Sequence, residues 1–323
     1  MKAFCGYIND EKLLKKCASG GFATAMYQTV LGNGGVVYGV AYTKNFKSAE
    51  FCRVTNESEL SNLRSSKYVK ATLTKEILDN IVKDLNSGIT VLFIGLPCDV
   101  GTVRNYITKK QIKDTDLYLV ELICHGPTIT PVLEQYIDNL EKKFKSKVKA
   151  FNVRYKNPYW LPMNVFVKFE NGKEYVKPFY QTEYGIAFSN LSREGCYNCI
   201  YKNNNHKGDL SIGDYWGVKE CDEGYNKFGT SVAICQTLKG ENFLTSLSNI
   251  SLYDVDLDRV LAGNPRYMET KQKLYENIQF QRIFESYGIK RATFKYLNPV
   301  HKIKSKLNSI LKNINKVQKK KKP

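Results

Sequence analysis

Two almost wholly apolar runs, each ending in a short loop that carries a cysteine, constrain this fold most. Residues 89–94 read ITVLFI and lead into GLPC, and residues 116–123 read DLYLVELI and lead into CHGP. Runs of this kind are typical of strands buried on both faces of a parallel sheet. A helical pattern follows each loop, so the chain alternates strand, turn and helix. We therefore expect both loops at the carboxyl edge of one sheet, where open α/β sheets bind their ligands.

After residue 146 the pattern changes to short strands, predicted at 148–155, 164–169 and 174–179. The predicted fold class is α/β: a mixed, mostly parallel sheet with flanking helices, then a strand-rich C-terminal part that carries a CxxC loop, and a basic helical tail. The predicted regions are 1–146, 147–286 and 287–323.

Composition excludes several classes of protein. Apolar residues make up 42% of the 323 residues and charged residues 25%, which are values of a globular chain. No apolar stretch is long enough to span a membrane, and the first residues lack the basic start and apolar run of a secretory signal. We expect a cytoplasmic protein whose nine cysteines are not paired in a disulfide framework.

The net charge of +18 is concentrated near the end of the chain. Twelve of the 49 basic residues follow Ser286, and no acidic residue does. Between 303 and 317, apolar residues recur at helical spacing among lysines, which predicts a basic amphipathic helix. Such a helix would dock residues 300–323 on an anionic membrane surface, at the inner face of the membrane, or pack its apolar stripe on the protein body. Few aromatic residues occur there, which argues against nucleic acid.

The cysteines suggest a metal centre. Cys196 and Cys199 form a CxxC pair, whose spacing places two thiolates on one ion or cluster. Cys98 and Cys124 follow the two buried runs and are expected at the same sheet edge. These four residues could hold a 4Fe-4S cluster. The alternative is a zinc site made by Cys196, Cys199, His206 and a further ligand.

Seven motifs occur in an order that resembles a known family. They are ASGGFATA (18–25), GGVVYGVAY (34–42), SSKYVKA (65–71), VLFIGLPCDVGTVRNYI (91–107), LICHGP (122–127), CYNC (196–199) and GDLSIGDYWGV (208–218). With these motifs the chain resembles the coenzyme F-420 hydrogenase/dehydrogenase beta-subunit family, in the short form associated with polysaccharide biosynthesis.

The resemblance implies a flavin- and iron–sulfur-dependent oxidoreductase or electron-transfer protein. It implies FAD bound by region 1–146, and one 4Fe-4S cluster, since the chain has no ferredoxin-like CxxCxxCxxxCP run. A one-electron carrier such as a ferredoxin is the implied partner, and coenzyme F-420 is one candidate substrate. The substrate itself is not named by these motifs.

The resemblance also implies roles for individual residues. The residues expected to contact the flavin are Ser19, Gly20, Gly21, Ser66, Lys67, Tyr68, Gly95, Pro97 and Gly126. Ser19 is the predicted N-cap of the helix that follows, whose N-terminus suits the pyrophosphate. Lys67 is expected to contact flavin or phosphates through its charge. His125 is the candidate proton donor, or else a structural histidine.

Two other functions fit the same residues. In the first, the chain is a non-catalytic interaction protein: an α/β domain that is held together by a metal site (metal-stapled) and that docks on a membrane or on partner enzymes. In the second, it is an electron-transfer subunit without an organic substrate of its own. Bound flavin would distinguish the oxidoreductase from the non-catalytic interaction protein. Turnover without a partner protein would argue against the electron-transfer subunit.

Overall fold

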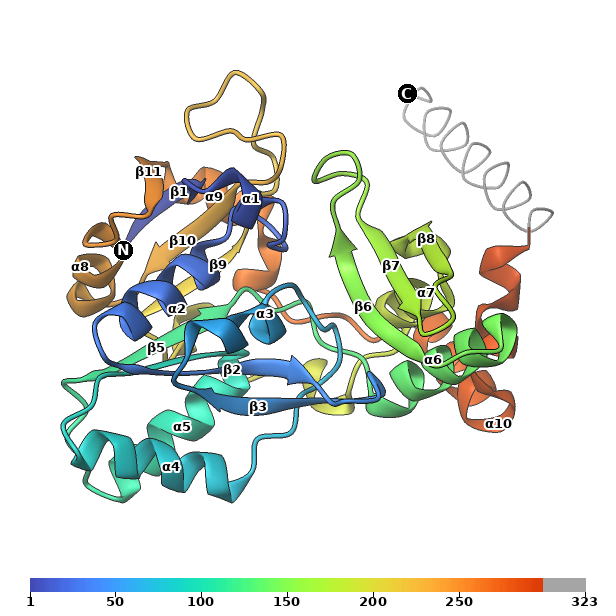
Figure 1. Cartoon of the computed structure of the whole chain (residues 1–323), viewed down its shortest axis with the longest axis horizontal. Helices are drawn as coiled ribbons and strands as arrows, with labels where there is room; N and C mark the ends of the chain where they lie inside the picture. The colour runs from blue at the N-terminus through green and yellow to red at the C-terminus, as the bar shows by residue number, and fades with distance from the viewer. Residues whose placement is uncertain (299–323) are drawn as a thin grey trace, which may run out of the picture.

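The computed structural model describes residues 1–298, which form two sheets lying side by side (Figure 1). The strands of the larger sheet are β1 (Lys2–Ile8), β2 (Val36–Tyr42), β3 (Ala49–Val54), β4 (Val91–Gly95), β5 (Leu117–Leu122), β9 (Leu210–Asp214), β10 (Ser231–Cys235) and β11 (Ile250–Asp254). The strands of the smaller sheet are β6 (Val148–Tyr155), β7 (Asn164–Phe169) and β8 (Glu174–Pro178). The order in the larger sheet is β11-β1-β10-β9-β5-β4-β2-β3.

The centre of the larger sheet is parallel and its outer strands are antiparallel. Strands β2, β4, β5 and β9 pair in parallel, whereas β3, β10, β1 and β11 are added in antiparallel pairs. The predicted α/β fold with a mixed sheet and flanking helices is confirmed, but the sheet is not mostly parallel, since four of its seven strand pairs are antiparallel. In the β4–β5 pair, Gly95 lies opposite Glu121, so the loops after both strands leave from the same edge, as predicted.

Helices cover both faces of the larger sheet. The helices are α1 (Glu11–Leu14), α2 (Phe22–Gly32), α3 (Leu60–Leu63), α4 (Lys75–Asn86), α5 (Pro97–Lys109), α6 (Thr130–Phe144), α7 (Glu183–Asn190), α8 (Leu238–Thr245), α9 (Leu257–Gly263) and α10 (Tyr275–Leu297). On one face, Phe22 and Met26 of α2 share a core with Leu92 and Val120. On the other face, residues of α4 and α5 pack with Phe93. Burial on both faces explains why β4 is a continuous apolar run and why β5 is one apart from Glu121.

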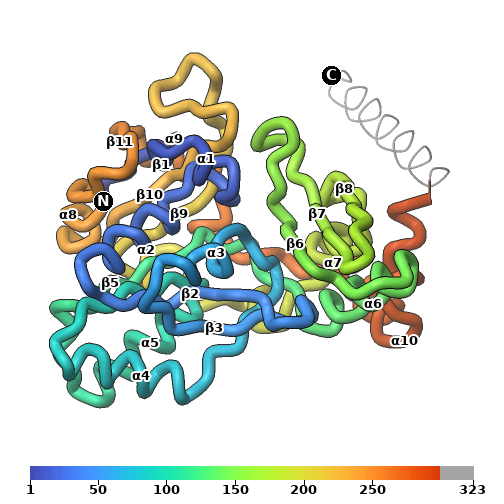
Figure 2. Tube along the Cα trace, in the orientation of Figure 1, coloured from blue at the N-terminus to red at the C-terminus, as the bar shows by residue number. Residues whose placement is uncertain are grey.

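The chain leaves the larger sheet after β5 and returns to it at β9. In between it forms α6, the smaller sheet and α7, and the path is clear in the tube view (Figure 2). The predicted start of the second region, at residue 147, is next to β6. Helix α10 also packs on this part, against α7 and α6. The sequence predicts a helix over 268–284, but α10 begins only at Tyr275, and a separate short helical turn occupies 265–267.

No helix within residues 1–298 is long and apolar enough to cross a membrane. The predicted amphipathic segment over 300–323 lies outside the described residues, so its predicted contact with a membrane surface stays a prediction.

Candidate functional site

Two of the four cysteines are positioned by the ends of neighbouring parallel strands. Cys98 lies in the first turn of α5, directly after β4, and Cys124 follows β5 by two residues. The carboxylate of Asp99 accepts a hydrogen bond from the Leu96 N–H at 3.2 Å and also pairs with Lys70, which fixes the turn that carries Cys98. The sequence motifs do not single out Asp99, although its position three residues into a helix is a capping signal.

The CxxC pair lies beside these two strand ends. Cys196 ends a short helical turn over Glu194–Cys196, and Cys199 follows three residues later. Gly126 brings the two loops together: its φ is +85°, and a Cβ there would lie 3.2 Å from the Ser192 hydroxyl and 3.4 Å from Cβ of Cys196. The Gly126 N–H also donates to the Cys124 sulfur at 3.3 Å. A backbone donor of this kind favours a charged sulfur and tunes a cluster that it would bind.

The four thiols influence one another electrostatically. Burial raises the pKa of Cys98 to about 12, with smaller contributions from Asp99, Cys124 and Cys199. Burial likewise raises the pKa of Cys124 to about 11, with contributions from Cys196 and Cys199. Burial also raises the pKa of Cys196, to which Cys98 and Cys199 add. The sequence-based expectation that these four residues lie at one place in the fold therefore agrees with the structure.

The two predicted metal sites share the CxxC pair and differ in their other ligands. Within residues 1–298 no group of three or more His, Cys, Asp or Glu side chains that could hold a metal ion is found, so the four-cysteine cluster stays a prediction. His206 faces elsewhere: Nδ1 lies 2.5 Å from Glu121, Nε2 lies 3.2 Å from the Tyr267 carbonyl, and the ring stacks on Tyr267. The zinc alternative that used His206 is therefore wrong.

A cavity of about 280 Å³ opens next to the cysteines. Its wall includes Cys124, and predicted ligand residues line it from several elements: Ser19, Gly21, Ser66, Lys67, Tyr68, Gly95, His125 and Gly126. Gly20 and Pro97 do not line it. Gly20 packs instead on the backbone of Gly6 and Ser231, where a Cβ would lie 2.3 Å from the Gly6 oxygen. The predicted flavin residues are thus largely gathered around one cavity.

Two of the predicted contacts differ in detail. Ser19 does not cap α2: its hydroxyl donates to the Thr230 carbonyl at 2.8 Å, and Gly21, with φ of +88°, is the N-cap. The ammonium of Lys67 does not face a ligand but donates to four carbonyls, those of residues 62–65. These bonds close the C-terminus of α3, which explains why a lysine is buried here.

A buried ion pair that the sequence reasoning missed supports the cavity wall. Arg154, from β6 of the smaller sheet, donates to both carboxylate oxygens of Asp214 at 2.8 and 3.1 Å. It also donates to the hydroxyl of Tyr68 and to the carbonyl of Ala18, at 2.9 and 2.8 Å. One guanidinium therefore joins the smaller sheet to three segments of the part of the chain that contains the larger sheet. The residues around Arg154 form no motif from which this contact could be predicted.

His125 lies on the cavity wall beside Cys124. Burial lowers the pKa of its imidazole, with Asp214 acting in the opposite direction. The neutral form of the ring, which accepts a proton rather than donates one, is therefore favoured. The role of proton donor stays a prediction.

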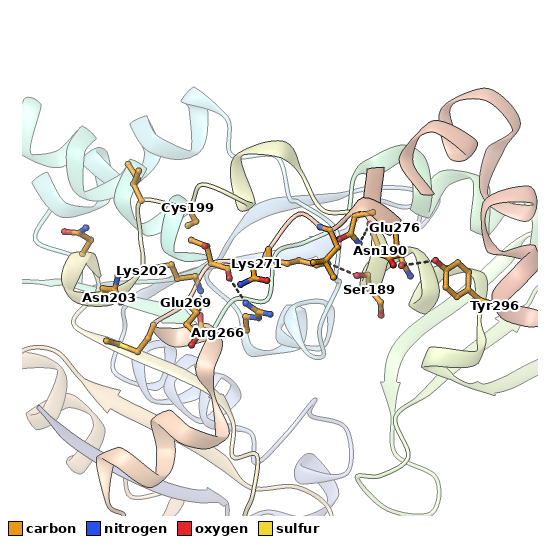
Figure 3. A pocket seen from close by; sticks show the side chains of 17 residues that line it. Ser189, Asn190, Cys199, Lys202, Asn203, Arg266, Glu269, Lys271, Glu276 and Tyr296 are labelled. Atoms are coloured by element: carbon orange, nitrogen blue, oxygen red, sulfur yellow. Dashed lines mark hydrogen bonds between the residues drawn. The ribbon is translucent and has the colours of Figure 1, made fainter. Parts of the chain in front are cut away.

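A second, larger cleft of about 1050 Å³ lies beside Cys199 (Figure 3). Cys199 is on its wall with Lys202, Arg266 and Lys271. These three cations donate to carbonyl oxygens, and Lys271 also to the Ser192 hydroxyl, but none has a carboxylate partner within the described part of the chain. Glu269 and Glu276 also line this cleft, so its wall carries charges of both signs.

Two buried lysines make stability depend on pH. Burial lowers the pKa of Lys67 and of Lys156 to about 7, whereas an unfolded lysine titrates near 10.4. Between these values the unfolded chain binds more protons, so the free energy of unfolding should rise with pH, by at most about 1.4 kcal/mol per pH unit for each lysine. Urea denaturation between about pH 7 and pH 9 measures the slope. An equal slope in Lys67→Met and Lys156→Met would contradict this account.

Known proteins share this fold. One solved structure that resembles the chain is a chain of the xenon-derivatised F-420-reducing [NiFe] hydrogenase complex from Methanosarcina barkeri, with a TM-score of 0.58 at 16% identity. The match covers 90% of this chain and 94% of that one, and at this identity it shows the fold. No curated protein sequence matches. The family described as the C terminus of the coenzyme F-420 hydrogenase/dehydrogenase beta subunit matches residues 89–256, just over half of the chain. The chain belongs to this family.

Membership confirms the resemblance found in the motifs. The matched residues include all four cysteines, His125 and the Arg154–Asp214 pair. The family is one of hydrogenase and dehydrogenase beta subunits, so the chain is of an oxidoreductase or electron-transfer type. Residues 1–88, which supply the N-terminus of α2 and the loop around Lys67, lie outside the matched stretch.

Proposed function

We propose that the chain is a flavin- and iron–sulfur-dependent oxidoreductase, with FAD in the cavity and one 4Fe-4S cluster on Cys98, Cys124, Cys196 and Cys199. One observation carries the proposal: Cys124 lines the cavity and also lies within electrostatic range of the CxxC pair. A ligand in the cavity and a cluster on the thiols would be neighbours. When bound, a flavin exchanges electrons in pairs and a cluster one at a time, so together they couple the two kinds of transfer.

The chemistry of the residues fits both groups. Four thiols, one of them accepting a backbone N–H, are the donor set that a 4Fe-4S cluster uses. The cavity is slightly smaller than the roughly 300–1000 Å³ of typical ligand pockets. It therefore has room for the flavin end of FAD, with the rest of the dinucleotide outside the cavity, and two buried polar atoms on its wall lack protein partners within residues 1–298.

Several side chains of this chain would act on a ligand in the cavity. His125 would hold a proton at a ring nitrogen. Arg154 orients Tyr68 and connects the smaller sheet to the larger sheet across the cavity. Trp216 stacks on Trp160, with ring centroids 5.2 Å apart, and helps to exclude water from one wall.

The partner in this proposal is a one-electron carrier such as a ferredoxin. Acidic carriers match cationic surfaces. Arg266 and Lys271 line the cleft beside Cys199 and make no ion pair within residues 1–298, although Glu269 and Glu276 line it too. The substrate is a small reducible molecule, with coenzyme F-420 and an intermediate of polysaccharide biosynthesis as the candidates. The proposed location is the cytoplasm, with residues 300–323 at the inner face of the membrane.

An anaerobic reductive titration tests whether the two groups are coupled. The purified protein should take up about three electrons per chain, two into flavin and one into the cluster. The Cys199→Ser variant should take up about two, and Cys221→Ser, at an exposed cysteine, should match the unmodified protein. Reduced ferredoxin should reduce the flavin only where the cluster is present. Equal flavin reduction by ferredoxin in Cys199→Ser would contradict the proposed route.

A further inference from the structure

Two polar atoms on the cavity wall are buried without a hydrogen-bond partner in the described residues. They are Nε of Arg64 and Oδ1 of Asn264. An unpaired buried polar group costs roughly 1–3 kcal/mol of desolvation, so native proteins seldom keep one without a reason. Neither residue belongs to the predicted site, and both lie outside the stretch that matches the family. A ligand in the cavity is the partner that would satisfy both atoms.

Arg64 lies at the end of the cavity formed by the N-terminus of α2. Cys17 lines the cavity at this end, and a Cβ on Gly21 would lie 3.2 Å from its sulfur. Burial raises the pKa of the Cys17 thiol, and the nearby charge of Arg64 acts to lower it. Helix α2 has no side-chain cap and no acidic residue in its first turn, so its first N–H groups remain available. A guanidinium and the positive end of a helix together favour an anion.

Arg64 is the cation at this end that remains free to bind a ligand. The ammonium of Lys67 is bound by four carbonyls, among them that of Arg64 at 2.8 Å. Lys156 donates to the carbonyls of Leu14 and Ser19, and Arg154 is held by Asp214. The bond from Lys67 also fixes the backbone from which Arg64 projects. The guanidinium of Arg64 has no hydrogen-bond partner among residues 1–298.

Asn264 lies in a different part of the wall, between α9 and the next helical turn. Its side chain is 1% exposed, and its Nδ2 donates to the Val260 carbonyl at 3.2 Å, which leaves Oδ1 as a free acceptor among the described residues. The neighbouring Gly263 packs against the Trp216 backbone, where a Cβ would lie 2.1 Å from the oxygen. Asn264 is therefore rigidly held beside Trp216 and suits an N–H donor of a ligand ring.

We propose that Arg64 binds the phosphate, and Asn264 an N–H of the ring, of a phosphorylated planar heteroaromatic ligand in this cavity. This inference rests on the proposed function, under which the ligand is a flavin nucleotide. It assigns two binding residues and an orientation: the phosphate lies toward the N-terminus of α2, and the ring toward Trp216 and Asn264.

Flavins with and without phosphate test the assignment directly. Dissociation constants for FMN, FAD and riboflavin are measured by fluorescence quenching on the full chain. Arg64→Gln should weaken FMN and FAD by roughly tenfold or more, the effect of a lost charge-assisted hydrogen bond, and leave riboflavin unchanged. Arg64→Lys should restore part of the FMN affinity. Asn264→Ala should weaken all three ligands alike, by roughly tenfold, whereas Asn264→Asp retains an acceptor and should weaken them less.

The controls separate this inference from the proposed function. Arg291→Gln, at an exposed position of α10, removes the same charge outside the cavity and should change no dissociation constant. Thermal unfolding of each variant checks that it is folded. Equal losses of riboflavin and FMN in Arg64→Gln, or unaltered binding in both single variants, would overturn the assignment while flavin binding stands. If the unmodified chain binds none of the three flavins, the proposed function fails as well.

Discussion

Replacing Cys196 or Cys199 by serine is expected to lower bound iron and sulfide from about four of each per chain to background. The serine hydroxyl is a poor substitute for a thiolate, and both residues lie near Cys98 or Cys124 rather than in a separate site. Cys98→Ser and Cys124→Ser should behave alike. Iron and sulfide analysis after anaerobic purification measures the loss.

Cys221→Ser is the matched control for these four variants. Cys221 is exposed and lies outside the cavity and the four-cysteine group, so its replacement should retain iron and sulfide in full. Flavin should remain bound in all five variants, since the wall of the cavity is otherwise unchanged. A full complement of iron in Cys196→Ser and Cys199→Ser would remove the CxxC pair from the ligand set.

Replacing Asp214 by asparagine is expected to lower the free energy of unfolding by about 3–5 kcal/mol. The change leaves the guanidinium of Arg154 buried without its anion, since the Arg154 side chain is 3% exposed. The double variant Arg154→Met/Asp214→Leu should recover much of the loss, because it removes both charges. Urea denaturation gives the free energies.

An exposed ion pair in the smaller sheet provides the control for Asp214. Lys168 and Glu174 lie 3.1 Å apart with both side chains almost half exposed. Glu174→Gln should therefore change the free energy of unfolding by less than about 1 kcal/mol. An equally small change in the free energy of unfolding in Asp214→Asn would show that the Arg154–Asp214 pair does not hold the two sheets together.

The centre of the fold and the cysteine site could be predicted because their signals are local. The strands β4 and β5 are apolar runs apart from Glu121, and each is followed within three residues by its cysteine. The strands of the smaller sheet alternate and are separated by turn residues, so their bounds were also predicted within about one residue. In both cases a single stretch of sequence contains the whole pattern.

Three strands of the larger sheet, β1, β9 and β11, could not be predicted in this way. Strand β1 pairs with β10 and β11, more than 200 residues later in the chain, and no local pattern identifies such partners. No local pattern predicts the short strands β9 and β11 either. The start of α10 was predicted seven residues too early, since residues 268–274, between the short turn at 265–267 and Tyr275, are not helical.

The site residues that were missed act through distant partners. Arg154 comes from the smaller sheet and meets Asp214 of β9. Arg64 and Asn264 meet at one cavity although 200 residues separate them. The opposite error occurred at Lys67, whose position in a polar loop suggests a charge open to ligand, whereas its bonds are to the carbonyls at the end of α3. Sequence alone cannot show which buried cation already has partners.

Anaerobic purification followed by iron, sulfide, zinc and flavin analysis tests the central claim most directly. The account predicts about four irons, about four sulfides and one flavin per chain, with a visible spectrum that contains both contributions. Flavin without iron would retain a flavoprotein but remove the four-cysteine cluster. Zinc without flavin would contradict the account and favour a metal-stapled interaction protein.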